Sequence, residues 1–134
     1  PFDGAEYDYY TTTKGVLEKV KAHVGDVDFA VQPELVSLLS SRNFGRYADE
    51  KGEMKVCFIS NNDITGGNSG SAMFNSKGEL LGLAFDGNWE AMSSDILYEP
   101  KMQRTIGVDV RYILFMIEKY GKAGNLIKEL NIIN

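Results

Sequence analysis

The sequence predicts a mainly β fold in which a few short helices flank the strands. Three runs of apolar and β-branched residues, at 54–60, 79–85 and 105–109, carry this prediction, because such residues are enriched in strands. A shorter run, 72–75, leads through Asn75-Ser76-Lys77-Gly78 into the second of them. A four-residue turn that ends in glycine between two strand-like runs predicts a β-hairpin.

Apolar residues at helical spacing predict three helices around these strands. The first helix ends at Gly25, and the second begins at Pro33, because proline suits a first helical position. The third follows the last strand and ends near Gly121, with one or two further helical turns after it. The apolar positions are Val16, Leu17, Val20, Val24, Leu35, Leu38, Leu39, Ile113, Met116, Ile117, Tyr120, Leu126, Ile127 and Leu130. Residues 1–13 are rich in aromatic residues and threonine, which predicts an extended edge segment.

The chain has 134 residues and a formal net charge of −5, which suits one domain over residues 1–134. Its acidic and basic residues are interspersed, which argues against a nucleic-acid surface. No apolar stretch is long enough to span a bilayer, so we expect no membrane partner. Cys57 is the only cysteine, and we expect it to pack as a small hydrophobe. Because the chain begins at Pro1, we expect a processed or excised piece of a longer protein.

A glycine-rich turn, Gly66-Gly67-Asn68-Ser69-Gly70-Ser71, lies between two predicted strands. Glycine tolerates a positive φ, so such a turn can expose the hydroxyl and aim successive N–H groups into one concavity. Acyl transfer needs a serine nucleophile beside donors for the developing oxyanion. We therefore interpret Ser69 as the nucleophile and the N–H groups of Gly67 and Ser69 as the oxyanion hole.

Other interpretations of this turn compete with the catalytic one. A Gly/Ser/Asn cluster is first of all a turn signal. A phosphate-binding loop would need a lysine after its glycines, and Gly70-Ser71-Ala72 has none. The nucleophile elbow Gly-x-Ser-x-Gly fails because Ser71 stands where its second glycine should be.

The sequence offers a poor general base and no metal site. His23 is the only histidine, and it shares the apolar face of the first predicted helix, so we expect a structural or surface role for it. One histidine, one cysteine and scattered carboxylates give no zinc-type ligand spacing, and no cofactor is expected. Asp63 precedes the turn and is expected to accept backbone N–H groups there.

The segment around Ser69 resembles the chymotrypsin-like serine peptidases, and Gly67–Ser71 is also similar to glutamyl endopeptidases. Longer runs, Asn62–Ser71 and Gly82–Glu90, resemble the bacterial dipeptidyl-peptidase 7 and 11 family, closer to the 7 type, and Gln103-Arg104 and Asp109–Tyr112 continue the likeness. The resemblance implies a double β-barrel peptidase with an inserted helical domain. This chain would be its C-terminal Greek-key barrel, lacking the histidine and aspartate of the triad. It also implies a periplasmic or secreted enzyme, for which a homodimer is one expectation.

The resemblance also assigns substrate contacts at Phe85, Asp86 and Gly87. It implies that Asp86 binds the substrate α-ammonium, although an Asp-Gly pair also suits a plain turn. Gly87 matches a position where relatives that prefer acidic P1 residues carry arginine, so we expect apolar or aromatic P1 side chains. Phe85 and Trp89 are candidates to line the same pocket, with buried packing as the alternative for each.

The resulting hypothesis is a serine dipeptidyl aminopeptidase that releases N-terminal dipeptides from oligopeptides. This chain would carry the nucleophile and would be inactive, or nearly so, without the missing barrel and helical domain. Two alternatives stay open, a chymotrypsin-like endopeptidase of the glutamyl-endopeptidase type and a non-catalytic peptide-binding barrel. Cleavage of N-terminally blocked peptides and labelling of Ser69 by a fluorophosphonate would separate the three.

Overall fold

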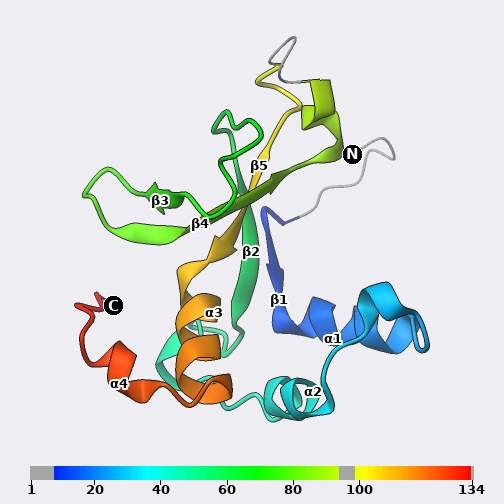
Figure 1. Ribbon diagram of the computed structural model, residues 1–134, viewed down its shortest axis with the longest axis vertical. Helices are drawn as coiled ribbons and strands as arrows, with labels where there is room; N and C mark the ends of the chain where they lie inside the picture. The colour runs from blue at the N-terminus through cyan, green and yellow to red at the C-terminus, as the bar shows by residue number, and fades with distance from the viewer. Residues whose placement is uncertain (1–7, 94–98, 134) are drawn as a thin grey trace. The chain divides into compact units, whose positions relative to one another are not determined.

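A computed structural model of the chain describes residues 8–93 and 99–133. The first seven residues of the predicted edge segment lie outside this range. The chain forms two compact units (Figure 1). The first comprises residues Pro1–Thr11 and Cys57–Asp109, and the second comprises Thr12–Val56 and Val110–Asn134. The single domain expected over residues 1–134 stays a prediction.

One five-stranded sheet, with the strand order β1-β2-β5-β4-β3, contains every strand of the described residues (Figure 1). The pairs β2/β5, β4/β5 and β3/β4 are antiparallel. The strands are β1 (Tyr10–Thr12), β2 (Lys55–Ser60), β3 (Ala72–Phe74), β4 (Leu80–Gly87) and β5 (Thr105–Asp109). The predicted mainly β fold and all four predicted strands are thereby confirmed. Closure into a Greek-key barrel stays a prediction.

The predicted hairpin is β3 and β4, joined by the turn Asn75–Gly78. The Asn75 N–H donates to the Glu79 carbonyl at 3.0 Å, and Asn75 Oδ1 accepts from the N–H groups of Lys77 and Glu79 at 2.9 and 3.0 Å. Gly78 has a φ of 77°, a conformation that glycine adopts without steric cost. The turn residues therefore fix the register of the hairpin.

Two glycines allow close packing at the centre of the first unit. A Cβ on Gly82 would lie 2.1 Å from the Val108 carbonyl oxygen. A Cβ on Gly107 would lie 2.8 Å from both the Phe58 ring and the Met73 sulfur. Phe58 is the cross-strand partner of Gly107, so the ring covers backbone that a side chain would otherwise occupy.

The second unit is helical and has its own apolar core. Its elements are α1 (Thr13–Ala22), η1 (Val27–Phe29), α2 (Pro33–Ser40), η2 (Gly45–Tyr47), α3 (Val110–Phe115), the π-helical turn η4 (Met116–Tyr120) and α4 (Gly124–Ile127). The predicted start at Pro33 and end near Gly121 are confirmed, whereas α1 ends at Ala22, before Gly25. The buried cluster is Leu39, Phe44, Tyr47, Met54, Leu114, Phe115 and Ile127. The rings of Phe44 and Tyr47 meet Phe115 edge to face.

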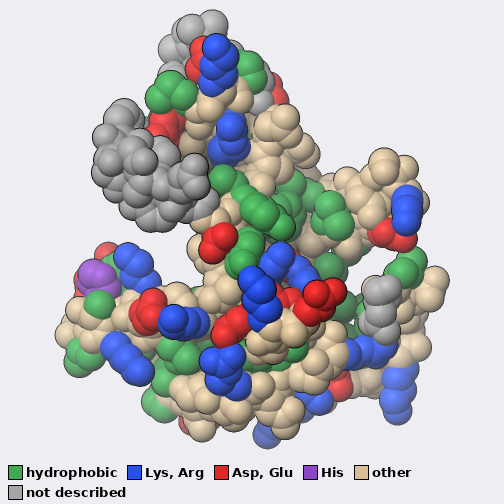
Figure 2. Space-filling view, turned by 180° about the vertical axis from the view of Figure 1, so that it is seen from behind, with side chains coloured by type: hydrophobic (Ala, Val, Ile, Leu, Met, Phe, Trp, Pro, Cys, Tyr) green, Lys and Arg blue, Asp and Glu red, His purple; other side chains and the backbone are tan. Residues whose placement is uncertain are grey.

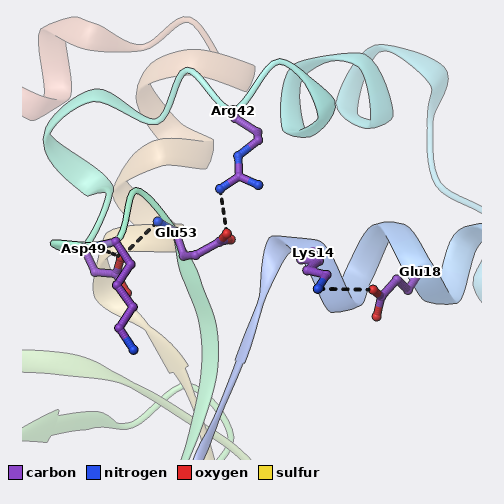
Figure 3. A network of polar contacts seen from close by, with 6 residues as sticks. Lys14, Glu18, Arg42, Asp49 and Glu53 are labelled. Atoms are coloured by element: carbon purple, nitrogen blue, oxygen red, sulfur yellow. Dashed lines mark hydrogen bonds and ion pairs between the residues drawn. The ribbon is translucent and has the colours of Figure 1, made fainter.

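A polar network holds the turn that leads into β2 (Figure 3). Asp49 Oδ1 accepts from the N–H groups of Lys51 and Glu53, both at 2.9 Å, and Arg42 pairs with Glu53 at 2.6 Å. The hydrogen bond from the Glu53 N–H is the main reason that the pKa of Asp49 lies below its usual range. Lys14 and Glu18 form a longer contact of 3.9 Å along α1.

Charged side chains of both signs are interspersed on the face drawn in Figure 2. Among the described residues, no helix combines the length and the hydrophobicity that a bilayer span requires. Cys57 is only half-buried, so its expected role as a small buried hydrophobe is met in part. Burial raises the pKa of its thiol.

Candidate functional site

The glycine-rich turn is a closed loop held by Asn68. Asn68 Oδ1 accepts from the Thr65 N–H at 2.8 Å, and the Asn68 N–H donates to the Thr65 carbonyl at 3.2 Å. Gly67 and Gly70 have φ values of 97° and 89°, which other residues rarely adopt. Asp63 was expected to accept N–H groups here, and this is wrong among the described residues, because Asn68 accepts instead.

Two backbone hydrogen bonds to β4 hold the segment that directly follows Ser69. The Gly70 N–H donates to the Ala84 carbonyl at 2.7 Å, and the Ala84 N–H donates to the Ser71 carbonyl at 2.8 Å. Ser69 itself is exposed, and its hydroxyl donates to the Phe85 carbonyl at 3.1 Å. The serine is therefore presented to solvent from a backbone position that β4 fixes.

Two backbone donors of this turn are free of protein acceptors. In the part of the chain that the structure describes, neither the N–H of Gly67 nor that of Ser69 donates a hydrogen bond. Both residues are exposed, so water or a ligand can reach these donors. An N–H pair beside a serine hydroxyl has the chemistry of an anion-binding site.

A β-bulge shifts the alternation of β4 beside the serine. Ala84 pairs with Gly107 and Asp86 pairs with Ile106, so Phe85 is the extra residue. Gly82 and Ala84 are buried, and strict alternation would bury Asp86 on the same face. Instead both Phe85 and Asp86 are exposed. The bulge thus keeps a carboxylate out of the interior, where it would need a partner.

The three residues that the resemblance assigned to substrate contacts form this bulge and the two positions after it. Asp86 Oδ1 accepts from the N–H of Gly87 at 2.8 Å, and no Lys or Arg of the described residues pairs with it. Phe85 is 58% exposed and Trp89 is 82% exposed. Buried packing, the alternative weighed for these two aromatic residues, is therefore wrong for both.

Gly87 packs closely against Ala91. A Cβ at this position would lie 2.8 Å from the Cβ of Ala91, in the 3₁₀ helix η3 (Trp89–Ser93) that follows β4. Its φ is not in the left-handed region, so glycine is needed here for space and not for conformation. Any side chain at position 87 requires η3 to move or residue 91 to shrink.

Asn88 joins the end of β4 to the segment before β5, and sequence reasoning missed it as an individual residue. Its Oδ1 accepts from the Arg104 N–H at 2.8 Å, and its N–H donates to the Arg104 carbonyl at 2.9 Å. Its Nδ2 donates to the Met102 carbonyl at 2.9 Å and to Glu90 at 2.7 Å. No sequence signal distinguishes this asparagine from a turn residue, because its partners Met102 and Arg104 lie 14 and 16 positions away.

Arg104 in turn binds the loop that carries it. Its guanidinium donates to the carbonyls of Pro100 and Gln103 at 2.8 and 2.6 Å, and to that of Lys101 at 3.2 Å. The neighbouring Gln103 is buried, and its Oε1 accepts from the Glu99 N–H at 3.0 Å. Residues 99–104 are therefore held by hydrogen bonds within their own loop, and this loop supports the end of β4.

His23 belongs to the second unit, where its ring stacks on Phe29 with 4.0 Å between centroids, as a structural role would predict. Within the described residues, His, Cys, Asp and Glu side chains form no group of three that could hold a metal ion. The first unit therefore brings together Ser69, the free donors and Asp86, without a histidine of its own among the described residues.

Comparisons with known proteins agree with one family. The model of the family Peptidase S46 matches residues 1–132. Dipeptidyl-peptidase 7 of Porphyromonas endodontalis is 60% identical over 133 residues, which are 99% of this chain and 16% of that protein. An Asp/Glu-specific dipeptidyl-peptidase of Capnocytophaga gingivalis is 47% identical over 133 residues, which are 99% of this chain and 18% of that protein.

The fold supports the same family. The crystal structure of Porphyromonas endodontalis DPP11 in complex with the dipeptide Arg-Glu matches with a TM-score of 0.90 and 43% identity, covering 96% of this chain and 18% of that one. The chain thus spans less than one fifth of the length of each of these relatives. Because the family model covers almost every residue and the relatives agree with it, this chain belongs to the peptidase S46 family.

Proposed function

We propose that this chain carries the nucleophile of a serine dipeptidyl peptidase, with Ser69 in that role and the N–H groups of Gly67 and Ser69 as the oxyanion hole. One observation carries the proposal. An exposed serine hydroxyl and two N–H groups without protein acceptors share a turn that is hydrogen-bonded to the strand bearing an exposed carboxylate, Asp86. Family membership supports the same chemistry.

The reaction follows from these parts. A base takes the Ser69 proton, and Oγ attacks the carbonyl carbon of the second substrate residue while the two N–H groups stabilise the oxyanion. Collapse breaks the peptide bond, and the base returns the proton to the amine of the shortened peptide. Water then hydrolyses the acyl-enzyme and releases the dipeptide. The hydroxyl must first leave the Phe85 carbonyl, which it contacts in the resting state.

In this proposal the position of Asp86 sets the length of the released fragment at two residues. A carboxylate and an α-ammonium form a charge-assisted hydrogen bond, and Asp86 has no competing cation among the described residues. Its separation from Ser69 is fixed because both are attached to the bulged end of β4. An amine held at that separation would place the second carbonyl at the serine, so exopeptidase action would follow from geometry.

We further propose apolar or aromatic P1 side chains, with Phe85 and Gly87 beside the pocket. Gly87 brings no charge that could pair with a P1 carboxylate, and Phe85 is exposed. The similarity to an Asp/Glu-specific relative keeps acidic P1 residues as the competing outcome of the test. The general base and its aspartate would come from the first barrel of a longer, periplasmic enzyme. That barrel, an inserted helical domain and a second subunit would be its partners.

The experiment compares the full-length enzyme with its Ser69→Ala variant on reporter dipeptides that carry a free or an acetylated amine. The expected result is release by the unmodified enzyme alone, from free amines alone, and fastest with apolar P1. Cleavage of acetylated peptides would keep Ser69 and replace the proposal by an endopeptidase. Fastest release with Asp or Glu at P1 would overturn the pocket assignment. Equal signals from both proteins would leave a non-catalytic peptide-binding module.

A further inference from the structure

We infer that Asn88 is the positioning residue that holds Asp86 and Gly87 at the working distance from Ser69. This inference rests on the proposed function and adds a residue to it that neither the glycine-rich turn nor the pocket contains. Asn88 is the first residue after β4, and Gly87 makes the last pair of the β4/β5 ladder, with Thr105. Beyond that pair, position is set by the contacts of Asn88.

The side-chain amide of Asn88 extends the ladder beyond its last backbone pair. The Arg104 N–H donates to Asn88 Oδ1, and the Arg104 carbonyl accepts from the Asn88 N–H, so one residue binds both backbone groups of Arg104. Nδ2 uses its two hydrogens on the Met102 carbonyl and on Glu90. An asparagine supplies two donors and an acceptor in one plane, and here all three functions are used.

The partners of Asn88 are themselves fixed. The Arg104 side chain donates to three carbonyls of its own loop, and the Asn88 carbonyl accepts from the N–H of Ala91 at 2.9 Å. Asn88 therefore links β4, the loop 99–104 and η3 in one hydrogen-bonded joint. Asp86 lies two residues before this joint, at the bulged end of β4.

Two substitutions test the joint with matched chemistry. Asn88→Asp keeps the shape and the Oδ1 acceptor, removes both donors, and places a second carboxylate against Glu90. Asn75→Asp makes the same change in the β3–β4 turn, where Asn75 Nδ2 donates to Glu79 at 2.5 Å and Oδ1 accepts from two N–H groups. Asn75 precedes β4 in the chain and Asn88 follows it, so only Asn88 adjoins Asp86.

The measurements are made on the full-length enzyme with a free-amine dipeptide reporter and with a fluorophosphonate, which reports Ser69 and has no amine. We expect Asn88→Asp to raise KM about tenfold, since small misplacements of a binding group cost about that much or more. The rate of fluorophosphonate labelling and kcat should stay within about threefold of the parent, because the Ser69 turn is untouched. Asn75→Asp should leave KM, kcat and the labelling rate unchanged.

A compensating variant keeps the test decisive if Asn88→Asp folds poorly. In Asn88→Asp/Glu90→Gln the new glutamine amide can donate to the new carboxylate, so the bond between positions 88 and 90 returns with its polarity reversed. This variant should recover at least about half of the KM change on a logarithmic scale, as expected for residues in contact. Failure of this recovery, an unchanged KM in Asn88→Asp, or a labelling rate that falls by as large a factor as KM rises would overturn the inference. An enzyme with no Ser69-dependent release would overturn the proposed function as well, and the two failures are thereby distinguished.

Discussion

The hydroxyl of Ser69 donates to the carbonyl oxygen of Phe85 across 3.1 Å, and Phe85 is the extra residue of the bulge in β4. Phe85 has no cross-strand partner in the register, since its neighbours Ala84 and Asp86 take those places. The same irregularity thus fixes the resting position of the serine hydroxyl and exposes Asp86. Bulges frequently re-aim side chains beside active sites, and here a single one acts on two proposed functional groups.

Gly67→Ala should abolish most of the activity while leaving the fold intact. The position has a φ of 97° and open space around it, so an added methyl group strains the backbone without a clash. Relief of that strain re-aims the N–H group, and loss of one oxyanion donor costs about 10²–10³-fold in kcat. The measurement is kcat on the dipeptide reporter. The control is Gly66→Ala, which has equal space and no left-handed φ, and an equal loss there would remove the special role of Gly67.

Gly87→Arg should need a second change before it can alter P1 preference. The new Cβ would lie 2.8 Å from the Ala91 Cβ, so the single variant should displace η3 and lose activity on every reporter. Gly87→Arg/Ala91→Gly removes that contact, and its guanidinium can then pair with a P1 carboxylate. The ratio of kcat/KM for glutamate over leucine at P1 should rise at least about tenfold, the scale of a charge-assisted pair. A ratio unchanged in an active double variant would contradict the pocket assignment.

Tyr47→Phe should destabilise the chain in a way that depends on acid. The Tyr47 hydroxyl donates to Glu118 at 2.5 Å, and this bond is the main cause of the lowered pKa of Glu118. A lowered carboxyl pKa adds stability at neutral pH that is lost as the pH falls through it. The variant should lose about 1–3 kcal/mol at pH 7, and less at pH 3, in urea denaturation.

Tyr120→Phe is the matched control for that pair. Tyr120 donates to the neutral amide oxygen of Gln32, so its loss should not change between pH 3 and pH 7. At alkaline pH the stability contributed by Tyr47 falls as the pH rises, whereas that of Glu118 falls as the pH drops. The reason is that burial raises the pKa of Tyr47 to about 12. The contribution of Tyr47 is complete below the ordinary tyrosine pKa and is lost as the pH rises from there through the raised pKa of about 12. Equal acid dependence in both variants would rule out the Tyr47–Glu118 pair as its source.

Gly82→Ala should be among the most damaging small substitutions in the first unit. Its Cβ would lie 2.1 Å from the backbone oxygen of Val108 in β5, and backbone in a sheet cannot yield as a flexible side chain can. We expect a loss of about 3 kcal/mol or more in the free energy of unfolding. Gly15→Ala, in the open interior of α1, should instead gain about 1 kcal/mol. A mild effect at position 82 would show that the β4–β5 packing is looser than described.

The local signals in the sequence determined most elements of the fold. Short apolar runs marked four strands, the Asn75–Gly78 turn marked the hairpin, and Pro33 and Gly121 marked helix ends, because each depends on neighbouring residues alone. The glycine-rich turn around Ser69 was found for the same reason. Its chemistry was named from residue types at fixed spacing, before any contact was known.

Only the tertiary structure decided how that turn relates to the rest of the first unit. The bulge at Phe85, the joint at Asn88 and the clash that keeps Gly87 small depend on contacts between residues as many as 23 positions apart. Sequence periodicity cannot reveal a bulge, because one extra residue changes the pairing without changing the composition. The sequence therefore identified the proposed reactive groups, while pairing between strands determined where they point.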